Sequence, residues 1–203
     1  MVIHRPFDEV LRSWSHVAVL RTLLDSAAGL TGNQVARASG MQPRSALKAL
    51  SSLEVLGIVR RQRGGRDHLF TLNRDHLLVQ EGLLPLYAAE SKLARALEES
   101  LSAALKGKVI AALIFGSVAR NDEEPASDLD VCCIVRTEND KETVRESLAA
   151  LSPTLLLRFG VRLAPLLFSD REARRQLRSP LVKRIVQEGK TIVGTLPRGL
   201  RHG

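Results

Sequence analysis

The sequence predicts an α+β protein with two domains, at residues 1–80 and 81–203. Three observations predict this fold class. In the first domain, short amphipathic helical stretches precede two β-prone runs that flank Gly64 and Gly65, as in a hairpin. In the second domain, apolar runs typical of buried strands alternate with helical segments, which predicts a mixed sheet with helices. The boundary falls within residues 74–90, and the absence of a Gly/Ser-rich linker there favours coupled domains.

The charge of the chain favours a polyanionic partner. The formal net charge is +8 and the pI about 10.2, a balance that bears on binding and not on fold. Residues 1–80 contain 11 Lys or Arg and 6 Asp or Glu, and residues 81–203 contain 19 and 16. The first domain therefore carries more than half of the excess positive charge.

The cysteines and the apolar runs indicate where the protein works. The only cysteines, Cys132 and Cys133, are adjacent, so on a strand they point to opposite faces and form no bridge with each other. This usage fits a reducing, cytoplasmic location. No apolar run approaches the roughly 20 residues needed to cross a bilayer, and the N-terminus lacks the pattern of a signal peptide. We therefore expect no membrane partner.

The first domain shows three helical stretches, at 15–25, 32–39 and 43–57. Thr31 and Gln34 match a capping box at the start of the second helix. The third helix begins at a proline, as first helical turns often do, and is expected to bury Leu47, Leu50 and Leu53. The hairpin follows, with basic side chains crowded at its tip.

The order helix, helix, turn, helix and basic hairpin, over about residues 12–73, resembles a winged helix-turn-helix domain. The resemblance implies that the second helix of the turn enters the major groove of double-stranded DNA while the wing contacts phosphates. The expected DNA-binding residues are Arg44, Ser45, Lys48, Arg60, Arg61, Arg63 and Arg66. Two other interpretations stay open, because these arginines could simply be solvated and because winged helices also serve as protein-docking modules.

A helix is expected to connect the two domains. Pro85 should interrupt a first short helix, after which Leu93, Leu97, Leu101 and Leu105 repeat every four residues as an apolar stripe. We favour packing of this stripe on the sheet that follows. The alternative is a homodimer contact, since winged-helix regulators often dimerise so that two recognition helices meet two half-sites.

The second domain places two polar motifs beside buried strands. A strand at 109–115 is followed by Gly116 and Ser117, and a strand, glycine turn and helix start can hold phosphate with backbone N–H groups. Asp128 and Asp130 begin the next strand, and their spacing of two puts both carboxylates on one face. Such a pair can share hard divalent cations. The competing interpretation is that residues 121–127 are only a surface turn. That interpretation explains the acidic loop but not the position of the Gly-Ser pair.

Together these motifs resemble the nucleotidyltransferase superfamily with DNA polymerase beta-like folds, and within it the minimal nucleotidyltransferases. The matching residues are Gly116, Ser117, Arg120, Ser127, Asp128 and Asp130. The resemblance implies that Gly116, Ser117, Arg120 and Ser127 bind the nucleotide, ATP or another NTP. It implies that Asp128 and Asp130 are catalytic and hold two metal ions, Mg²⁺ or Mn²⁺, for in-line attack on the α-phosphorus.

The third carboxylate that normally completes this metal site is missing from the sequence. The next strand, expected within 161–170, offers Arg162, Ala164 and Pro165 but no acid. The acids after it, at positions 170 and 172, fall in a first helical turn, where acids have an ordinary electrostatic role. A similar strand without the acid occurs in proteins that join a winged helix to this transferase fold, which this chain resembles over most of its length.

These features leave three functional interpretations. The first is a DNA-binding transcriptional regulator whose nucleotidyltransferase-fold domain binds Mg-nucleotide. The second is an active nucleotidyltransferase that moves a nucleoside monophosphate from an NTP to a protein, RNA or small-molecule acceptor, including an antitoxin-like enzyme that modifies a partner protein. The third is a pure interaction module. The basic residues at 171–184 are either a solvated face, which we favour, or a second surface for nucleic acid.

Overall fold

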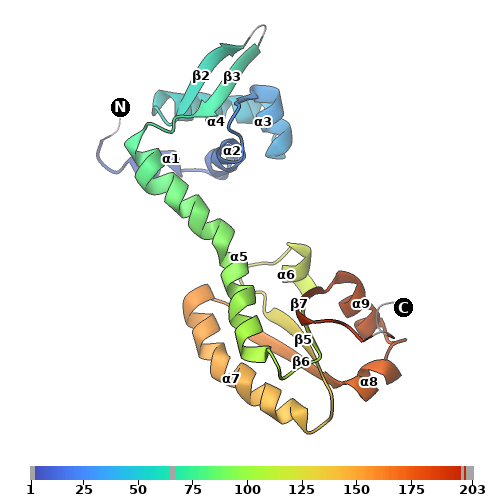
Figure 1. Cartoon of the computed structure of the whole chain (residues 1–203). Coiled ribbons are helices and arrows are strands. Elements are labelled where there is room, and N and C mark those ends of the chain that lie inside the picture. The colour runs from blue at the N-terminus through green and yellow to red at the C-terminus, as the bar shows by residue number, and fades with distance from the viewer. Residues whose placement is uncertain (1–2, 65–66, 198, 200–203) are drawn as a thin grey trace. The chain divides into compact units, whose positions relative to one another are not determined.

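The computed structural model describes residues 3–64, 67–197 and 199. The chain forms two compact units, Met1–Ser91 and Lys92–Gly203 (Figure 1). The division therefore falls after residue 91, whereas the sequence placed it at 80. It lies inside one long helix, because that helix supplies apolar side chains to the second unit from Leu97 onward. No helix in the described part of the chain is long and apolar enough to span a bilayer.

The first unit consists of short helices and a three-stranded antiparallel sheet with the order β1-β3-β2. Its elements are α1 (Pro6–Val10), α2 (Trp14–Leu24), β1 (Leu30–Thr31), α3 (Gly32–Ala38), α4 (Pro43–Val55), β2 (Val59–Gly64) and β3 (Asp67–Leu72). The predicted capping box is confirmed, because the Gln34 backbone N–H donates to Thr31 Oγ1 and the Thr31 N–H donates to Gln34 Oε1. The hairpin is confirmed as well, with Val59 paired to Leu72.

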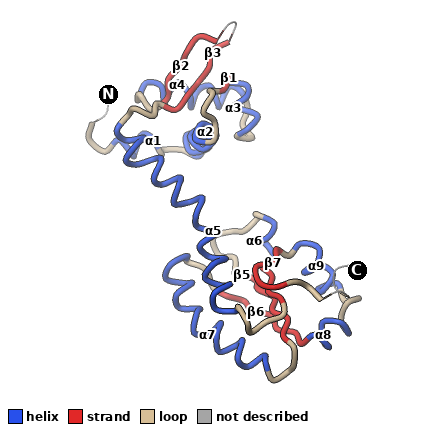
Figure 2. Tube along the Cα trace, in the orientation of Figure 1, coloured by secondary structure: helices blue, strands red, loops and turns tan. Residues whose placement is uncertain are grey.

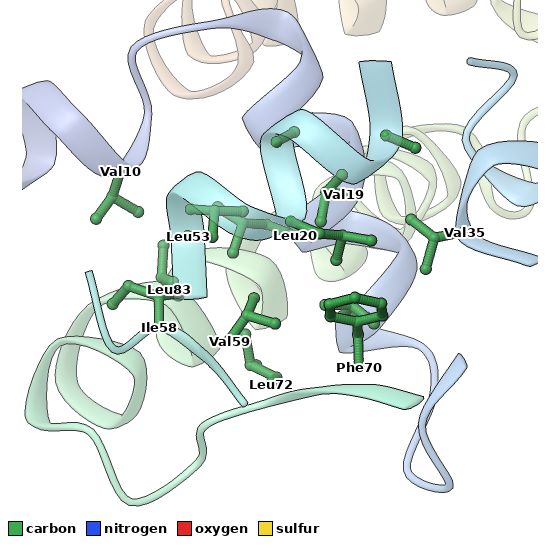
Figure 3. Packing of buried hydrophobic residues seen from close by; sticks show 14 of the residues in the cluster. Val10, Val19, Leu20, Val35, Leu53, Ile58, Val59, Phe70, Leu72 and Leu83 are labelled. Atoms are coloured by element: carbon green, nitrogen blue, oxygen red, sulfur yellow. The ribbon is translucent and has the colours of Figure 1, made fainter. Parts of the chain in front are cut away.

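The core of the first unit lies between the helices and the sheet. Figure 3 shows Leu20 of α2, Leu53 of α4 and Phe70 of β3 pointing into it. The expectation that Leu47 is buried was wrong, because Leu47 is 44% exposed. The buried face of α4 consists of Ala46, Ala49, Leu50 and Leu53, so it is rotated by one position from the predicted stripe. Two alanines in the buried set allow α4 to lie close to its neighbours.

The helix that leaves the first unit passes through Pro85 without a break. The π-helix η1 (Val79–Leu83) runs directly into α5 (Leu84–Leu105). In this wider turn the Leu84 N–H donates to the Val79 carbonyl, five residues back. A proline has no N–H to place in the helical ladder, and a π turn beside it absorbs the mismatch. The predicted interruption at Pro85 is therefore replaced by a change of helical pitch.

The second unit is a four-stranded mixed sheet with helices on both faces. Its remaining elements are β4 (Ala111–Phe115), α6 (Gly116–Arg120), β5 (Leu129–Val135), α7 (Asp140–Phe159), β6 (Leu163–Ser169), α8 (Asp170–Arg175), α9 (Pro180–Glu188) and β7 (Lys190–Gly194). The strand order is β6-β5-β4-β7, with β5 and β6 parallel and the other pairs antiparallel. Figure 2 shows the strands of this sheet in red between α7 and the α8–α9 pair. The predicted mixed sheet with helices is confirmed.

Alternate residues of β5 point to two separate cores. Val131, Cys133 and Val135 pack with α5 and α7, whereas Cys132 and Ile134 pack with α8 and α9. Leu97, Leu101 and Leu105 of the predicted stripe lie in the first of these cores, while Leu93 is 51% exposed. The two cysteines thus lie on opposite faces as predicted, and burial raises the pKa of both thiols to about 12.

Candidate functional site

The Gly-Ser turn and the Asp-x-Asp segment meet at one edge of the sheet of the second unit. Antiparallel pairing of β4 with β5 places Phe115 opposite Asp130, so Gly116 follows directly beside that carboxylate. Gly116 has a φ of +74°, and an ideal Cβ built on it would lie 3.1 Å from Cγ of Asp130 and closer still to Oδ2. Both the backbone conformation and the space therefore require glycine at this position.

Asp128 and Asp130 lie on the sheet face that α8 and α9 cover. Counting by twos along β5, they fall in line with Cys132 and Ile134, which pack in the α8–α9 core. Asp128 is exposed and Asp130 is half-buried. Burial and the nearby charge of Asp128 raise the pKa of Asp130, while Arg184 and Arg120 act in the opposite direction. A cation bound between the two carboxylates would offset the repulsion between their negative charges.

The position beside Asp130 on the neighbouring strand holds no acid. The parallel register pairs Asp130 with Ala164 of β6, so a methyl group stands where the third carboxylate was sought. Pro165 is paired with Val131, one position further along. Within the described ranges, no group of three or more His, Cys, Asp or Glu is arranged to hold a metal ion. Among the described residues, the pair of aspartates therefore has no third acid beside it on β6.

Asp170 and Glu172 lie at the end of the sheet opposite to Asp130, at the start of α8. Glu172 forms a capping box with Ser169 at the start of α8 and an ion pair with Lys141. The Lys141 ammonium lowers the pKa of Glu172. Asp170 pairs with Arg174 one turn later, at 2.9 Å. Both acids therefore have local structural partners and lie away from Asp130.

Two arginines that were not among the predicted site residues come near the aspartate pair, Arg184 by helix packing and Arg162 by strand register. The charge of Arg184 on α9 opposes the burial and the Asp128 charge that together raise the pKa of Asp130. The Arg162 carbonyl accepts a hydrogen bond of 2.7 Å from the Leu129 N–H, which puts Arg162 next to Asp128. The alternation along β6 assigns Arg162 to the face of Ala164. The sequence showed these arginines, but only strand register and helix packing reveal their place.

Arg120 forms two ion pairs in the folded protein. Its Nε lies 3.0 Å from Asp122 Oδ2 and its Nη1 lies 2.9 Å from Glu188 Oε2, at the end of α9. These two hydrogen bonds, that of Asp122 first, raise the pKa of Arg120. Arg120, which the family resemblance assigns to nucleotide binding, is thus already paired with two carboxylates of this domain. Glu188 was not among the predicted site residues, because it lies 68 positions away in the sequence.

Comparison with known proteins agrees with this arrangement. Residues 99–196 match the family model described as "Polymerase beta, Nucleotidyltransferase". The second unit is a nucleotidyltransferase-fold domain. No curated protein matches the chain.

Several solved structures are similar to this chain at low scores. A toxin–antitoxin crystal structure with AMP-PNP has a TM-score of 0.35 and 18% identity over 51% of this chain and 80% of the other. A mutant of the toxin–antitoxin MntA-HpeT has a TM-score of 0.34 and 17% identity over the same shares. TrmBL2, an archaeal chromatin protein with a novel mode of DNA binding, has a TM-score of 0.29 and 17% identity over 90% of this chain and 73% of the other. Likenesses of this strength carry no functional argument.

The two serines of the motif differ in how they are used within the nucleotidyltransferase-fold domain. Ser117 lies half-buried in the first turn of α6, and its carbonyl accepts from the Asp122 N–H at 3.1 Å. Ser127 closes the acidic loop, because its Oγ accepts from the Glu124 N–H at 2.9 Å and its own N–H donates to the Glu124 carbonyl at 2.8 Å. In this structure Ser127 therefore positions the loop that leads into Asp128.

The residues predicted to bind DNA lie on α4 and β2 of the first unit. Arg44, Ser45 and Lys48 are exposed on α4. Of the hairpin arginines, Arg60 pairs with Asp75 at 2.9 Å and Arg61 pairs with Glu54 at 3.2 Å. Arg63 is exposed and has no ion-pair partner among the described residues. Arg66 lies outside the described residues.

Proposed function

We propose that this protein is a DNA-binding transcriptional regulator whose nucleotidyltransferase-fold domain binds Mg-nucleotide as an effector. One observation carries the proposal. The carboxylate pair of Asp128 and Asp130 is assembled against Gly116, while Ala164 occupies the neighbouring position where a third acid would stand. The residues that would bind a metal and a phosphate are present, whereas Ala164 stands where a carboxylate would help to deprotonate an attacking hydroxyl.

The arrangement of side chains fits a nucleotide with its metal. Asp128 and Asp130 would hold Mg²⁺ or Mn²⁺, and hard divalent cations of this kind keep waters and substrate phosphates as their other ligands. The metal would neutralise the phosphates and offset the burial and the nearby Asp128 charge, which together raise the pKa of Asp130. Ser117, Arg120 and Arg184 would contact the phosphates of ATP or another NTP from the α6 and α9 side. Guanidinium groups suit this task because they donate two parallel hydrogen bonds.

The first unit supplies the DNA-binding part of the proposal. We propose that it is a winged helix-turn-helix domain, with α4 as the recognition helix and the β2–β3 hairpin as the wing. The exposed Arg44, Ser45 and Lys48 support major-groove contact by α4, and the exposed run on β2 supports phosphate contact by the hairpin. A homodimer would present two such helices to two half-sites of double-stranded DNA.

An active nucleotidyltransferase is the second candidate, and one observation favours it. The two aspartates share one face beside the Gly-Ser turn, and Asp128 is exposed to an incoming acceptor. The acceptor, a partner protein above all, could itself bring the base that β6 lacks. Transfer would then occur only in the complex with that acceptor, which fits an antitoxin-like enzyme.

Calorimetry tests the nucleotide part directly. Mg-ATP is titrated into the wild type and into an Asp128→Ala, Asp130→Ala variant, with Mn²⁺ as a second arm. We expect saturable binding by the wild type and at least a tenfold loss in the variant, because each tenfold is about 1.4 kcal/mol and two metal ligands are removed. A Glu123→Ala, Glu124→Ala variant is the control, since it removes the same charge from the adjacent loop. Equal losses in both variants would contradict the proposal.

Gel shifts and label transfer separate the two candidates. The regulator predicts that duplex from the protein's own upstream region is shifted, and that Mg-ATP changes the shift in the wild type but not in the aspartate variant. Absence of a shift with any duplex at low salt would refute DNA binding. The enzyme predicts transfer of α-labelled nucleotide to an acceptor, which the same aspartate variant abolishes.

A further inference from the structure

The positive charge of the nucleotidyltransferase-fold domain is concentrated in one segment. Residues 170–190, which span α8, α9 and the turn between them, contain seven Lys or Arg and three Asp or Glu. Residues 81–203 as a whole contain 19 and 16, so the remainder of this half holds 12 and 13. The basic excess of the second half of the chain therefore lies entirely in this segment.

Most cations of this segment have no acidic partner. The three acids are already used, Asp170 by Arg174, Glu172 by Lys141 and Glu188 by Arg120. Five exposed cations of this segment form no ion pair with any residue that the structure describes, namely Arg171, Arg175, Arg178, Lys183 and Arg184. We call these five residues the α8–α9 basic surface. Uncompensated clusters of one sign repel themselves and attract polyanions.

The basic surface lies on the same side of the sheet as the aspartate pair. Ala173 of α8 and Ile185 of α9 pack on the face that carries Cys132 and Ile134, which is the face of Asp130. Figure 1 shows α8 and α9 on the other side of this sheet from α7. At one end of the surface, α9 reaches the Gly-Ser motif, because Glu188 at the end of α9 pairs with Arg120 of α6 at 2.9 Å. The surface therefore begins at the candidate nucleotide site.

The basic surface also extends beyond the reach of one nucleotide's phosphates. α8 follows the far end of β6, where Ser169 pairs with Val135, whereas Asp130 pairs with Ala164 at the near end. Five strand residues separate the two ends, which corresponds to about 16 Å. A triphosphate held at Asp130 and Arg120 leaves Arg171, Arg175 and Arg178 without a ligand. A chain of repeating phosphates can contact both ends.

We propose that the α8–α9 basic surface binds the phosphate backbone of a nucleic-acid strand and leads it toward the Asp128–Asp130 edge. Four of its five cations are arginines, whose planar guanidinium groups match phosphate oxygens. The chain has few aromatic residues, 3% in all, so binding rests on phosphate charge rather than on base stacking. This interaction is separate from duplex binding by the first unit, and it shares only Arg184 with the proposed nucleotide site.

Fluorescence anisotropy on the full chain tests this proposal. All proteins in this experiment carry Arg44→Ala and Lys48→Ala, which weaken the proposed DNA surface of the first unit. The protein with these two substitutions alone is called the background. The probes are labelled oligo(U) and oligo(dT) of about 15 nucleotides, near the upper site size of single-strand binding folds. The test variant is Arg175→Gln, Arg178→Gln, Lys183→Gln. The control variant, Lys106→Gln, Arg145→Gln, Arg158→Gln, removes three exposed cations from α7 and from the turn after α5.

We expect the test variant to bind oligo(U) or oligo(dT) at least tenfold more weakly at low salt. The slope of log K against log salt should fall by about 2, because each phosphate contact on a single strand contributes about 0.7. The control variant should stay within about twofold of the background. Equal affinity for the two probes would identify the backbone alone as the ligand, and tighter binding of oligo(U) would add recognition of the 2′-hydroxyl.

Three results would overturn the proposal. Equal losses in the test and control variants would mean that only net charge matters. Unchanged affinity in the test variant would show that these cations are only solvated and do not contact the nucleic acid. Loss of all single-strand binding in the Arg44→Ala, Lys48→Ala background would assign the binding to the first unit. Mg-ATP calorimetry on the same proteins reports the nucleotide site separately, so its failure and the failure of this surface can be told apart.

Discussion

The carboxylate of Asp130 occupies the space that a side chain on Gly116 would need. An ideal Cβ at Gly116 would lie 3.1 Å from Asp130 Cγ. The residues are neighbours because β4 and β5 pair with Phe115 opposite Asp130. The Gly-Ser turn and the Asp130 carboxylate, which we propose to bind phosphate and metal, therefore pack directly against each other, and changing either residue should displace the other.

Gly116→Ala should weaken Mg-nucleotide binding by tenfold or more. The alanine methyl would push the Asp130 carboxylate away, and the φ of +74° would be strained as well. Gly107→Ala is the matched control, because Gly107 has a φ of +81° and nothing within 4 Å of an ideal Cβ. Both variants should lose about 1 kcal/mol of stability from backbone strain, but only Gly116→Ala should lose binding in calorimetry. Comparable binding losses in both would assign the effect to strain alone.

Glu188→Gln should strengthen Mg-nucleotide binding. Glu188 holds Arg120 in an ion pair at 2.9 Å, and phosphates must compete with it for the guanidinium group. Partly exposed pairs are worth about 0.2–1 kcal/mol, so the affinity should rise by up to about fivefold. Glu142→Gln breaks the pair with Arg145 on α7 and should leave the affinity unchanged. Weaker binding in Glu188→Gln would show that Glu188 instead positions Arg120 for the phosphates.

Asp130→Asn should stabilise the protein while it removes metal binding. Burial and Asp128 raise the pKa of Asp130, with Arg184 and Arg120 opposing, so the folded protein binds this proton more tightly than the unfolded chain. Stability is therefore lost as the pH rises from the ordinary range through the raised pKa. Without metal at pH 7, the melting temperature should rise by about 2 °C.

The pH dependence is the internal control for Asp130→Asn. Below about pH 4, the ordinary range for an aspartate, the wild-type carboxyl is protonated in both states and the difference should disappear. Scanning calorimetry at the two pH values makes the measurement. A variant that is less stable than the wild type at pH 7 would show that the ionised carboxylate makes a stabilising contact.

Ala164→Asp should add the carboxylate that the site lacks. The register places residue 164 directly beside Asp130, on the strand that runs parallel to β5. With Mn²⁺ and α-labelled ATP, this variant should transfer label at least tenfold faster than the wild type, a typical contribution of a positioned base being about 10²-fold or more. Ala164→Asn is the matched control of equal size without the charge. Identical rates in the two variants would mean that the missing acid does not limit transfer.

Arg63→Ala should weaken duplex binding more than Arg61→Ala. Arg63 is exposed without an ion-pair partner among the described residues, whereas Arg61 must first leave Glu54, 3.2 Å away. Loss of a phosphate contact should lower the salt slope of binding by about 1 in Arg63→Ala. Anisotropy with duplex DNA at several salt concentrations measures both variants. Equal small effects would remove the hairpin from the interface.

Local features of this protein could be predicted from its sequence because neighbouring residues decide them. The capping box of Thr31 and Gln34 satisfies backbone groups three residues apart. The Gly-Ser turn and the alternation along β5 follow from the same short-range geometry. The absence of an acid from β6 could also be predicted, because the residue types of a strand can be read from the sequence once its position is predicted. The nucleotidyltransferase fold of the second unit was predicted from the resemblance of the Gly-Ser and Asp-x-Asp motifs to that superfamily.

Only the tertiary structure decided which distant residues complete the site. Strand register put Ala164 beside Asp130, and packing of α9 brought Glu188 to Arg120 and Arg184 toward Asp130. Packing also turned Leu47 outward and carried the helix past Pro85 through a π turn. The physical reason is the same in each case. Register and helix rotation depend on the sum of many side-chain contacts across the unit, which no single stretch of sequence contains.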